Sequence, residues 1–369
     1  MIGHPFIPQH LIGRQAELHQ VSQILNEDRD VLLAGVPGIG RRTLIRAAAK
    51  QSRARVVEID CLRATDYRRF LDLMAAAILE TFDAESELEL IHRWSQDQPF
   101  ILQSTTGRPN LIWHFSSGKE WALFQALLTL PQRLAEWLDC RVVLVFLNFP
   151  HLRSWDRGKK WETYLCEEIQ RQSRVSYALI ATVAERLTDQ NDLQVVSLSP
   201  ISDADLEAWI LEAMASERLK FEPDSQALPL FLSYVQGHFG DAITLARRIW
   251  IELGQTQREK NLDLDTFKLV QPHQVHRSAI ALVEDLSVTF ESLILLLPNS
   301  QVRVLESLAL DPTDSPHARE YIQKHNLSRG GGLQGALASL EQKGLVYGAE
   351  LGYRIALPLL GLWLKYRLG

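Results

Sequence analysis

The sequence DVLLAGVPGIGRRTL, from Asp30 to Leu44, combines three local signals in a fixed order. Val31–Ala34 is a short apolar run that predicts a buried strand, and the segment after it is rich in glycine. A helix-compatible segment begins at Arg41. In such a strand, loop and helix, backbone N–H groups and the helix N-terminus face a bound anion. The stretch therefore predicts a phosphate-cradling loop.

The loop keeps the spacing of the pattern GxxxxGK[ST] but not the two residues that carry its chemistry. Gly35 and Gly40 occupy the glycine positions, whereas Arg41 stands at the position of the phosphate-binding Lys. Arg42 stands at the position of the Ser or Thr that binds Mg²⁺. Thr43 lies one position too late, so on a helix its side chain points about 100° away from the metal position. We expect the cradle to be present and its metal chemistry to be altered.

The composition is that of an ordinary globular protein. Of the 369 residues 46% are hydrophobic and 23% are charged, and the net charge is −6. This length predicts two or three domains, and nucleic-acid binding would need a local basic patch. Cys61, Cys140 and Cys166 are widely spaced, so we expect reduced thiols rather than a disulfide framework or a metal site. We find no signal-peptide pattern and no membrane-length apolar run, which favours a cytoplasmic protein.

Short apolar strands alternate with amphipathic helices in the first 200 residues, which predicts a parallel sheet with helical crossovers. The predicted strands are residues 31–34, 56–59, 141–147, 177–181 and 195–198, and the predicted helices are residues 15–25, 41–51, 67–82, 119–138 and 161–172. The helix at 119–138 is expected to break or kink near Pro131. Residues 84–118 are treated as an insertion that holds a hairpin with strands at 100–103 and 111–115.

The predicted fold class is an α/β P-loop NTPase-like domain with a parallel sheet (1–200), followed by an all-α lid (201–297) and a winged-helix domain (298–369). Lid helices are expected near 203–215, 225–234, 239–253 and 275–297. The last segment has helices at 301–309, 316–324 and 332–343 and a small hairpin at 346–355. Helix, helix, turn, helix and hairpin in this order predict a winged helix.

Seven motifs spread over nearly the whole chain resemble, in order, those of the AAA+/STAND class of P-loop ATPases, closest to the archaeal-type ATPases of prokaryotic genomes. The first three are Ile12-Gly13-Arg14 with Glu17-Leu18, similar to "hGRxxEL", GVPGIGRRTL, similar to "GxxGIGKTTL", and VVLVFLNFP at 142–150, where the class has an apolar strand ending in Asp-Glu. The others are LIAT at 179–182, similar to the sensor strand, LSPIS at 198–202, similar to "LxPLS", GHF at 237–239, similar to "GhP", and ALPLLGLWLKYRL at 356–368, similar to "dPlfrlWlr".

The resemblance implies a nucleotide site. In the class, the first motif lines the adenine pocket, the glycine loop holds the phosphates, and a polar residue forms the tip of the sensor strand. The nucleotide-binding residues of this chain would then be Ile12, Gly13, Gly35, Gly38, Ile39, Gly40, Arg41, Arg42, Thr43, Thr182 and His238.

The resemblance also shows where catalytic groups are replaced. Leu147 stands where an Asp would hold Mg²⁺, Asn148 where a Glu would activate water, and Phe239 where the lid has Pro. Leu offers no metal ligand, and loss of a positioned base alone typically lowers a rate ~10²–10⁴-fold. We expect no catalytic residues, no bound metal and no useful ATP hydrolysis. Two alternatives stay open for the pocket: ATP or ADP held without Mg²⁺ by Arg41 and Arg42, or no nucleotide at all.

Two segments are candidate DNA contacts. Residues 316–369 carry 7 Lys or Arg against 3 Asp or Glu, and the third helix of the winged helix offers Arg329, Gln334 and Lys343. Many winged helices dock proteins instead, so both kinds of partner stay open. The sequence RSWDRGKKW at 153–161 offers Arg157, Lys159 and Lys160 with interleaved Trp, which suits a nucleic-acid backbone with stacked bases. The alternative is a solvated loop that its two Trp residues anchor to the core.

Three functional hypotheses follow. The first is a catalytically degenerate protein that acts as a scaffold or signalling adaptor, assembling with a protein partner and, in one version, on DNA. The second is a nucleotide-binding ATPase with a rearranged metal site, in which Arg41 replaces the Lys and Thr43 or Asp60 binds the metal, and which regulates a DNA-associated process. The third is a transcription regulator whose ATPase-like part only dimerises. Self-assembly is left open, and no membrane partner is expected.

Overall fold

The computed structural model describes residues 6–8, 10–104, 109–113, 120–169, 173–184, 193–260 and 267–369. The chain forms two compact units. The sheet unit comprises Ala16–Ala34 and Arg41–Ser197, and the C-terminal unit comprises Met1–Gln15, Gly35–Gly40 and Leu198–Gly369. The glycine loop therefore groups with the C-terminal unit, although the segments on either side of it belong to the sheet unit.

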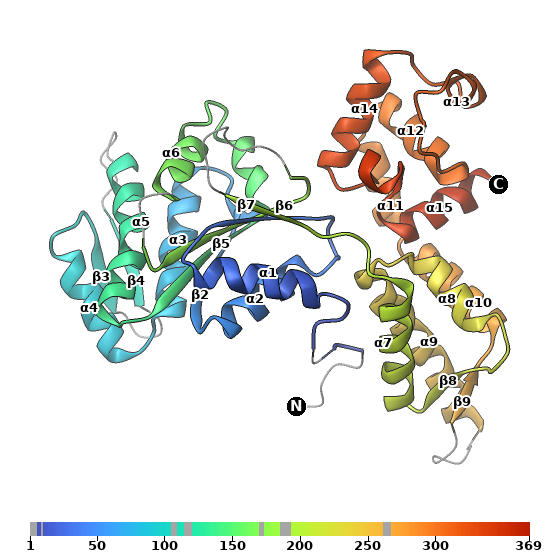
Figure 1. The fold of residues 1–369 in the computed structure, drawn as a ribbon, viewed down its shortest axis with the longest axis horizontal. Coiled ribbons are helices and arrows are strands. Elements are labelled where there is room, and N and C mark those ends of the chain that lie inside the picture. The colour runs from blue at the N-terminus through green and yellow to red at the C-terminus, as the bar shows by residue number, and fades with distance from the viewer. Residues whose placement is uncertain are drawn as a thin grey trace. The chain divides into compact units, whose positions relative to one another are not determined.

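A five-stranded sheet forms the centre of the sheet unit (Figure 1). Its strands are β1 (Val31–Ala34), β2 (Ala54–Asp60), β5 (Arg141–Leu147), β6 (Val175–Ala181) and β7 (Gln194–Ser197). They lie in the order β2-β5-β6-β1-β7, and every neighbouring pair is parallel. All five predicted strands and their parallel arrangement are confirmed.

Helices cover both faces of this sheet, as its apolar central strands require. The helices are α1 (Gln15–Asn26), α2 (Arg41–Gln51), α3 (Tyr67–Thr81), α5 (Glu120–Trp137) and α6 (Lys160–Ile169). Figure 1 shows α1 and α2 on one side of the sheet and α3 and α5 on the other. Leu144 and Phe146 of β5 share a buried cluster with Phe70 of α3 and Phe124 of α5.

The insertion differs from the prediction in one respect. The hairpin is present as β3 (Ile101–Ser104) and β4 (Pro109–Ile112), but it is preceded by an unpredicted helix, α4 (Glu85–Ser95). The part of the predicted second strand at 114 and 115 lies outside the described residues. The predicted break at Pro131 is absent. A single helix, α5, continues through Pro131, whose side chain is buried.

The lid segment is helical, with one addition. Its helices are α7 (Asp203–Ser216), α8 (Ala227–Val235), α9 (Phe239–Lys260), α10 (Pro272–Asp285) and α11 (Ser287–Leu295). Two short parallel strands, β8 (Leu219–Phe221) and β9 (Lys268–Val270), were not predicted. The single helix expected at 275–297 is divided at Leu286 into α10 and α11.

The C-terminal segment is a winged helix, as predicted. It contains α12 (Asn299–Leu310), α13 (Arg319–Lys324), α14 (Gly331–Gln342), the antiparallel strands β10 (Val346–Tyr347) and β11 (Arg354–Ile355), and α15 (Pro358–Leu368). Buried leucines of α14 join the same hydrophobic cluster as Leu305 and Leu308 of α12. The fold class of parallel sheet, helical lid and winged helix is confirmed.

Candidate functional site

The glycine loop, residues 35–40, has a backbone that only glycine adopts readily at two positions. Gly38 has φ +83° and Gly40 has φ +101°, values that cost an L side chain conformational strain. A Cβ added at Gly40 would have no other atom within 4 Å. Ile39 between them is 1% exposed. The loop therefore needs glycine at these two positions and is anchored by one buried side chain.

Residues at the start of α9 hold this loop from the lid. The Nε2 atom of His238 lies 2.7 Å from the carbonyl oxygen of Pro37, and the amide of Gly240 donates to the carbonyl of Gly38 at 3.1 Å. A Cβ added at Gly38 would lie 2.6 Å from the His238 ring. His238 is 4% exposed. The predicted lid residue therefore binds the loop backbone directly.

Asp241 continues this contact toward the winged helix. Its Oδ1 lies 3.0 Å from Nδ1 of His238, and its Oδ2 accepts a hydrogen bond of 3.1 Å from the amide of Leu359 in α15. Burial alone would lower the pKa of His238, but the hydrogen bond and charge of Asp241, with the carbonyl of Pro37, outweigh it and raise the pKa. Three successive contacts, from Pro37 to His238, Asp241 and Leu359, thus link loop, lid and winged helix.

The two residues predicted to line an adenine pocket lie against the first turn of the lid. Gly13 has φ +59°, and a Cβ on it would lie 3.0 Å from side-chain atoms of Asp205 and Ile201. Ile12 packs against the lid's hydrophobic cluster. Within the C-terminal unit, the structure therefore brings both residues to the lid, as it does the glycine loop.

Arg41 lies on the sheet unit, at the first position of α2. Its Nη1 donates a hydrogen bond of 2.7 Å to the carbonyl of Ala181, the last residue of β6. Burial lowers the pKa of Arg41 to about 10, which leaves the guanidinium charged at neutral pH. Thr182, the predicted sensor residue, follows Ala181 directly. A guanidinium has five N–H donors, so Arg41 can hold this carbonyl and still bind an anion.

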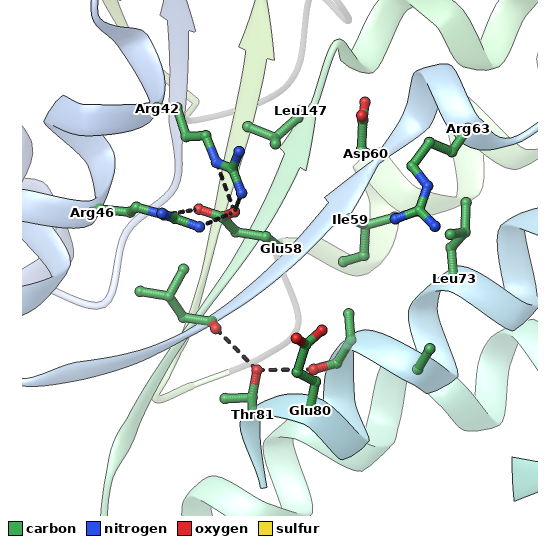
Figure 2. Close-up of a pocket in the computed structure, with 13 residues that line it drawn as sticks. Arg42, Arg46, Glu58, Ile59, Asp60, Arg63, Leu73, Glu80, Thr81 and Leu147 are labelled. Atoms are coloured by element: carbon green, nitrogen blue, oxygen red, sulfur yellow. Dashed lines mark hydrogen bonds and ion pairs between the residues drawn. The ribbon is translucent and has the colours of Figure 1, made fainter. Parts of the chain in front are cut away.

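Arg42 turns toward the edge of the sheet (Figure 2). Its Nε and Nη2 atoms donate to Oε2 of Glu58 on β2 at 2.9 and 2.5 Å, and Arg46, one turn further along α2, also binds this carboxylate. The Glu58 side chain is 13% exposed. Burial alone would raise the pKa of Glu58, but the hydrogen bonds from Arg46 and Arg42 outweigh it and lower the pKa. Sequence reasoning missed Glu58, although two Arg residues four apart on one helix face predict a shared anion.

A cavity of about 820 Å³ opens beside this cluster, between α2, β2 and α3 (Figure 2). Its volume lies within the ~300–1,000 Å³ typical of ligand pockets. Its charged lining residues are Arg42, Arg46, Arg63, Glu58, Asp60 and Glu80. Basic and acidic side chains are therefore balanced, and two of the three arginines already have a carboxylate partner.

The positions expected to hold metal and water lie at the ends of β5 and β2. Leu147 pairs in register with Asp60. Asn148 has the left-handed φ of +54°, and its Nδ2 donates to Oδ1 of Asp60 at 3.0 Å. The same Asp60 oxygen accepts the amide of Leu62 at 3.2 Å. Thr43 is exposed on α2. Asp60 is thus the carboxylate that the structure brings to this corner.

The basic segment at 153–161 is built into the core through its aromatic residues. Trp155 and Trp161 pack with Phe70, and Trp161 also stacks on Tyr67. Asp156 accepts hydrogen bonds from the first amides of α6. Both Trp rings are engaged, which favours the anchored loop over base stacking. Arg157, Lys159 and Lys160 are exposed.

Of the three winged-helix candidates for DNA contact, one is used inside the domain. Lys343 Nζ donates to Oε1 of Gln301 at 3.1 Å and to Oγ of Ser339 at 2.6 Å. Arg329 and Gln334 are both exposed. Arg329 lies just before α14, and Gln334 lies within its first turns.

The parallel sheet with its glycine loop, the helical lid and the winged helix define a P-loop ATPase-like architecture. Residues 10–154 match the family described as AAA ATPase domain, and residues 288–366 match the family described as probable winged helix domain. No curated protein matches the sequence significantly.

Solved structures share this fold at low sequence identity. The Walker-type ATPase of Pyrococcus abyssi superposes with a TM-score of 0.65 at 14% identity, covering 96% of both chains. The ORC1 protein of Aeropyrum pernix in complex with DNA has a TM-score of 0.52 at 14% identity, covering 97% of this chain and 94% of that one. The ADP form of the Aeropyrum pernix ORC2 protein has a TM-score of 0.53 at 13% identity, covering 99% and 97%.

Residues 10–154 therefore resemble an AAA ATPase domain and residues 288–366 a winged helix domain, and the first likeness supports a nucleotide site. Among the residues described, no three His, Cys, Asp or Glu side chains are grouped so that they could hold a metal ion. No helix in the described part of the chain is both long enough and apolar enough to span a membrane.

Proposed function

We propose that this chain is a nucleotide-binding AAA-domain protein with little or no ATP hydrolysis, which acts as a scaffold or signalling adaptor for a protein partner. The observation that carries the proposal is the Arg42–Glu58 ion pair. At the position where the motif places a metal-binding hydroxyl, the chain has a guanidinium that is bound to a carboxylate of β2.

The residues at the metal positions do not fit Mg²⁺. This ion requires near-octahedral oxygen ligands, usually one or two carboxylates with substrate phosphates. The Leu147 side chain has no oxygen to offer, and the Asn148 side chain could supply only its amide oxygen. Asp60 already accepts hydrogen bonds from the Asn148 side chain and the Leu62 amide. This supports a nucleotide bound without Mg²⁺ and argues against metal-assisted hydrolysis.

Phosphate binding has more support than hydrolysis. The glycine loop keeps the positive φ values at Gly38 and Gly40, and Arg41 follows it directly with a charged guanidinium. Arginine binds phosphate through a planar fork of N–H donors and needs no metal to do so.

The winged helix has features that favour a protein partner over DNA. Lys343 is exposed like Arg329 and Gln334, but it already donates to Gln301 and Ser339, so a contact with DNA would compete with these hydrogen bonds. The ORC1 protein is described in complex with DNA, so DNA remains the second partner to test.

The test is binding of a fluorescent ATP analogue with Mg²⁺ and with EDTA, together with measurement of phosphate release. We expect binding in EDTA at least as tight as in Mg²⁺, loss of binding in Arg41→Ala, and no phosphate release. The double variant Arg41→Lys/Arg42→Thr should gain affinity in Mg²⁺. Phosphate release that Arg41→Ala abolishes would refute the proposal.

One observation favours the alternative of an ATPase with a rearranged metal site. Asp60 lies in register with Leu147 and contacts Asn148, so a carboxylate is present at the corner where the second hypothesis needs one. In that case hydrolysis would require Mg²⁺ and would be lost in Asp60→Asn. A matched control is Asp66→Asn, which removes the carboxylate that caps the N-terminus of α3.

A further inference from the structure

A second cavity lies within the C-terminal unit, between the lid and the winged helix. It has a volume of about 280 Å³, slightly below the ~300 Å³ at which typical ligand pockets begin. It is lined by Ser233, Tyr234, Gln236, Leu308, Ala309, Pro312, Arg354, Ile355, Pro358, Gly361, Leu362 and Lys365. These residues come from α8 and the turn after it, the end of α12, β11, and α15, and α8 packs against α15.

The charge of this cavity is of one sign. Arg354 and Lys365 are its two charged lining residues, and none of the described residues that line it is acidic. The cavity in the sheet unit differs, because Arg42 and Arg46 are there bound to Glu58. Like charges at one site repel each other, and a bound anion reduces that repulsion. The lining of the smaller cavity therefore presents positive charge without a lining carboxylate to balance it.

Arg354 gives the most specific indication. Its Nε atom is buried and has no hydrogen-bond partner among the described residues. The guanidinium carbon lies 5.4 Å from the centre of the Tyr347 ring, which positions the side chain without accepting its N–H hydrogens. Buried donors are nearly always satisfied in folded proteins, so one that is not calls for a ligand or another specific explanation.

The remaining lining residues indicate the shape of a ligand. Leu308, Ile355 and Leu362 supply apolar surface, and the side-chain amide of Gln236 supplies N–H donors. The Ser233 hydroxyl already donates to the carbonyl of Leu230 at 2.7 Å and can only accept from a ligand. Tyr234 is held in place by its hydroxyl, which lies 2.6 Å from Nδ1 of His276. A lining that combines apolar side chains with two cations suits a molecule with one charged end.

We propose that this cavity binds a small organic oxyanion, whose phosphate or carboxylate pairs with Arg354 and Lys365 and whose apolar body lies against Leu308, Ile355 and Leu362. Because α8 belongs to the lid and α15 to the winged helix, the bound molecule stabilises the packing of these two segments. This site is separate from the glycine loop, and its existence does not depend on the function proposed above.

The experiment uses the full chain and two probes, phenyl phosphate and benzoate, with benzyl alcohol as a neutral probe of similar size. Binding is measured by isothermal titration calorimetry and by the shift of the thermal unfolding midpoint. We expect saturable binding and a raised midpoint for at least one anion, and neither for benzyl alcohol. The anion that binds identifies the charged group as phosphate or carboxylate.

Substitutions test whether the anions bind at Arg354 and Lys365. Arg354→Gln and Lys365→Gln should each weaken binding by about tenfold or more, and Arg354→Lys should retain part of it. Lys220→Gln, an exposed lysine of β8 outside the cavity, is the matched control and should change nothing. Lys365 is exposed, so its variant is expected to fold even if Arg354→Gln does not.

Three outcomes would overturn the proposal. The first is the absence of saturable binding by both anions. The second is unchanged affinity in Lys365→Gln together with unchanged affinity in a folded Arg354 variant. The third is binding that disappears in Arg41→Ala, which would assign it to the glycine loop. A failure of the unmodified protein to bind nucleotide, with anion binding retained, would contradict only the proposed function.

Discussion

Arg42 and Glu58 form a two-point contact in which Nε and Nη2 of the guanidinium bind the same carboxylate oxygen, Oε2, at 2.9 and 2.5 Å. Arg46 completes the cluster from the next turn of α2. The contact joins the helix that follows the glycine loop to the edge strand of the sheet. It also removes the charge of Arg42 from the position where the motif has a metal-binding hydroxyl.

Replacing Glu58 with Gln should therefore destabilise the protein modestly and in a pH-dependent way. The Arg42 and Arg46 side chains are 58% and 54% exposed, so solvent screening limits the expected loss to about 1 kcal/mol at pH 7. The folded-state pKa of Glu58 is lowered, so its stabilisation is present above the unfolded pKa and is lost as pH falls through the folded pKa. Urea unfolding at pH 7 and at acidic pH measures this.

The matched control for Glu58 is Glu89→Gln, an exposed glutamate on α4. The two variants should differ in stability at pH 7 and converge in acid. Equal stability of both variants at pH 7 would mean that the cluster contributes nothing to folding.

The contact of His238 with the glycine loop predicts a specific coupling between two positions. Gly38→Ala and Gly40→Ala both place a side chain at a positive φ, which costs about 1 kcal/mol or more. Only the Cβ at Gly38 would meet the His238 ring. In a double-mutant cycle, His238→Ala should therefore recover part of the Gly38→Ala loss and none of the Gly40→Ala loss. The measurement is the free energy of unfolding of each single and double variant.

Purely additive effects in the Gly38 cycle would show that the imidazole does not pack on the loop in solution. Faster hydrogen exchange at the Gly240 amide in His238→Ala would be an independent sign of the same contact, because this amide donates to Gly38.

Asp30 makes the wild-type protein less stable as pH rises toward neutrality. Burial raises the pKa of this carboxyl to about 7, despite a hydrogen bond of 2.7 Å from the Tyr177 amide that opposes the shift. Because the folded pKa exceeds the unfolded one, the folded state binds more protons between roughly pH 4 and 7, and stability falls across that range. Asp30→Asn should keep the hydrogen bond through its amide oxygen and be more stable than wild type at pH 8, on the order of 2 kcal/mol.

The measurement for Asp30 is urea unfolding of wild type and Asp30→Asn at pH 5 and pH 8. The advantage of the variant should grow with pH. Parallel stability profiles across this range would show that the carboxyl titrates normally in the folded protein.

Asn148 is expected to have two structural roles. Its backbone adopts a left-handed conformation, and its side chain donates a hydrogen bond to Asp60. Asn tolerates the left-handed region better than most residues, and its φ is +54°. Asn148→Ala should cost about 1–2 kcal/mol, from the strained backbone and the lost hydrogen bond to Asp60. Asn148→Gly relieves the strain and should cost less. If denaturation shows the two variants to be equally unstable, the hydrogen bond alone accounts for the residue.

The regular elements of the sheet unit could be predicted from local sequence because their signals are local. Val31–Ala34 and Arg141–Leu147 are apolar runs buried on both faces, and their predicted bounds equal the observed ones. The glycine loop is likewise a local signal, since Gly38 and Gly40 are needed for backbone angles within the loop itself. The winged helix followed from the order of its elements.

Local sequence signals were insufficient for elements whose formation depends on tertiary packing. Pro131 is accommodated inside α5, where it is one of the buried residues of the helix, and β8 pairs with β9 although the two strands lie far apart in the sequence. The expected break at Pro131 rested on local propensity, which packing can override.

The same distinction between local sequence and tertiary packing applies to the candidate site. The sequence by itself determined which groups are present: three glycines, Arg41 and Arg42 at the motif positions, and Leu147 and Asn148 at the end of a buried strand. Only the tertiary structure decided their partners, because a side chain of several rotatable bonds is oriented by whichever group the fold brings near it. Glu58 on β2 binds Arg42 on α2, and Asp60 at the end of β2 accepts a hydrogen bond from Asn148, which follows β5. His238 contacts Pro37, which lies 201 residues away in the sequence.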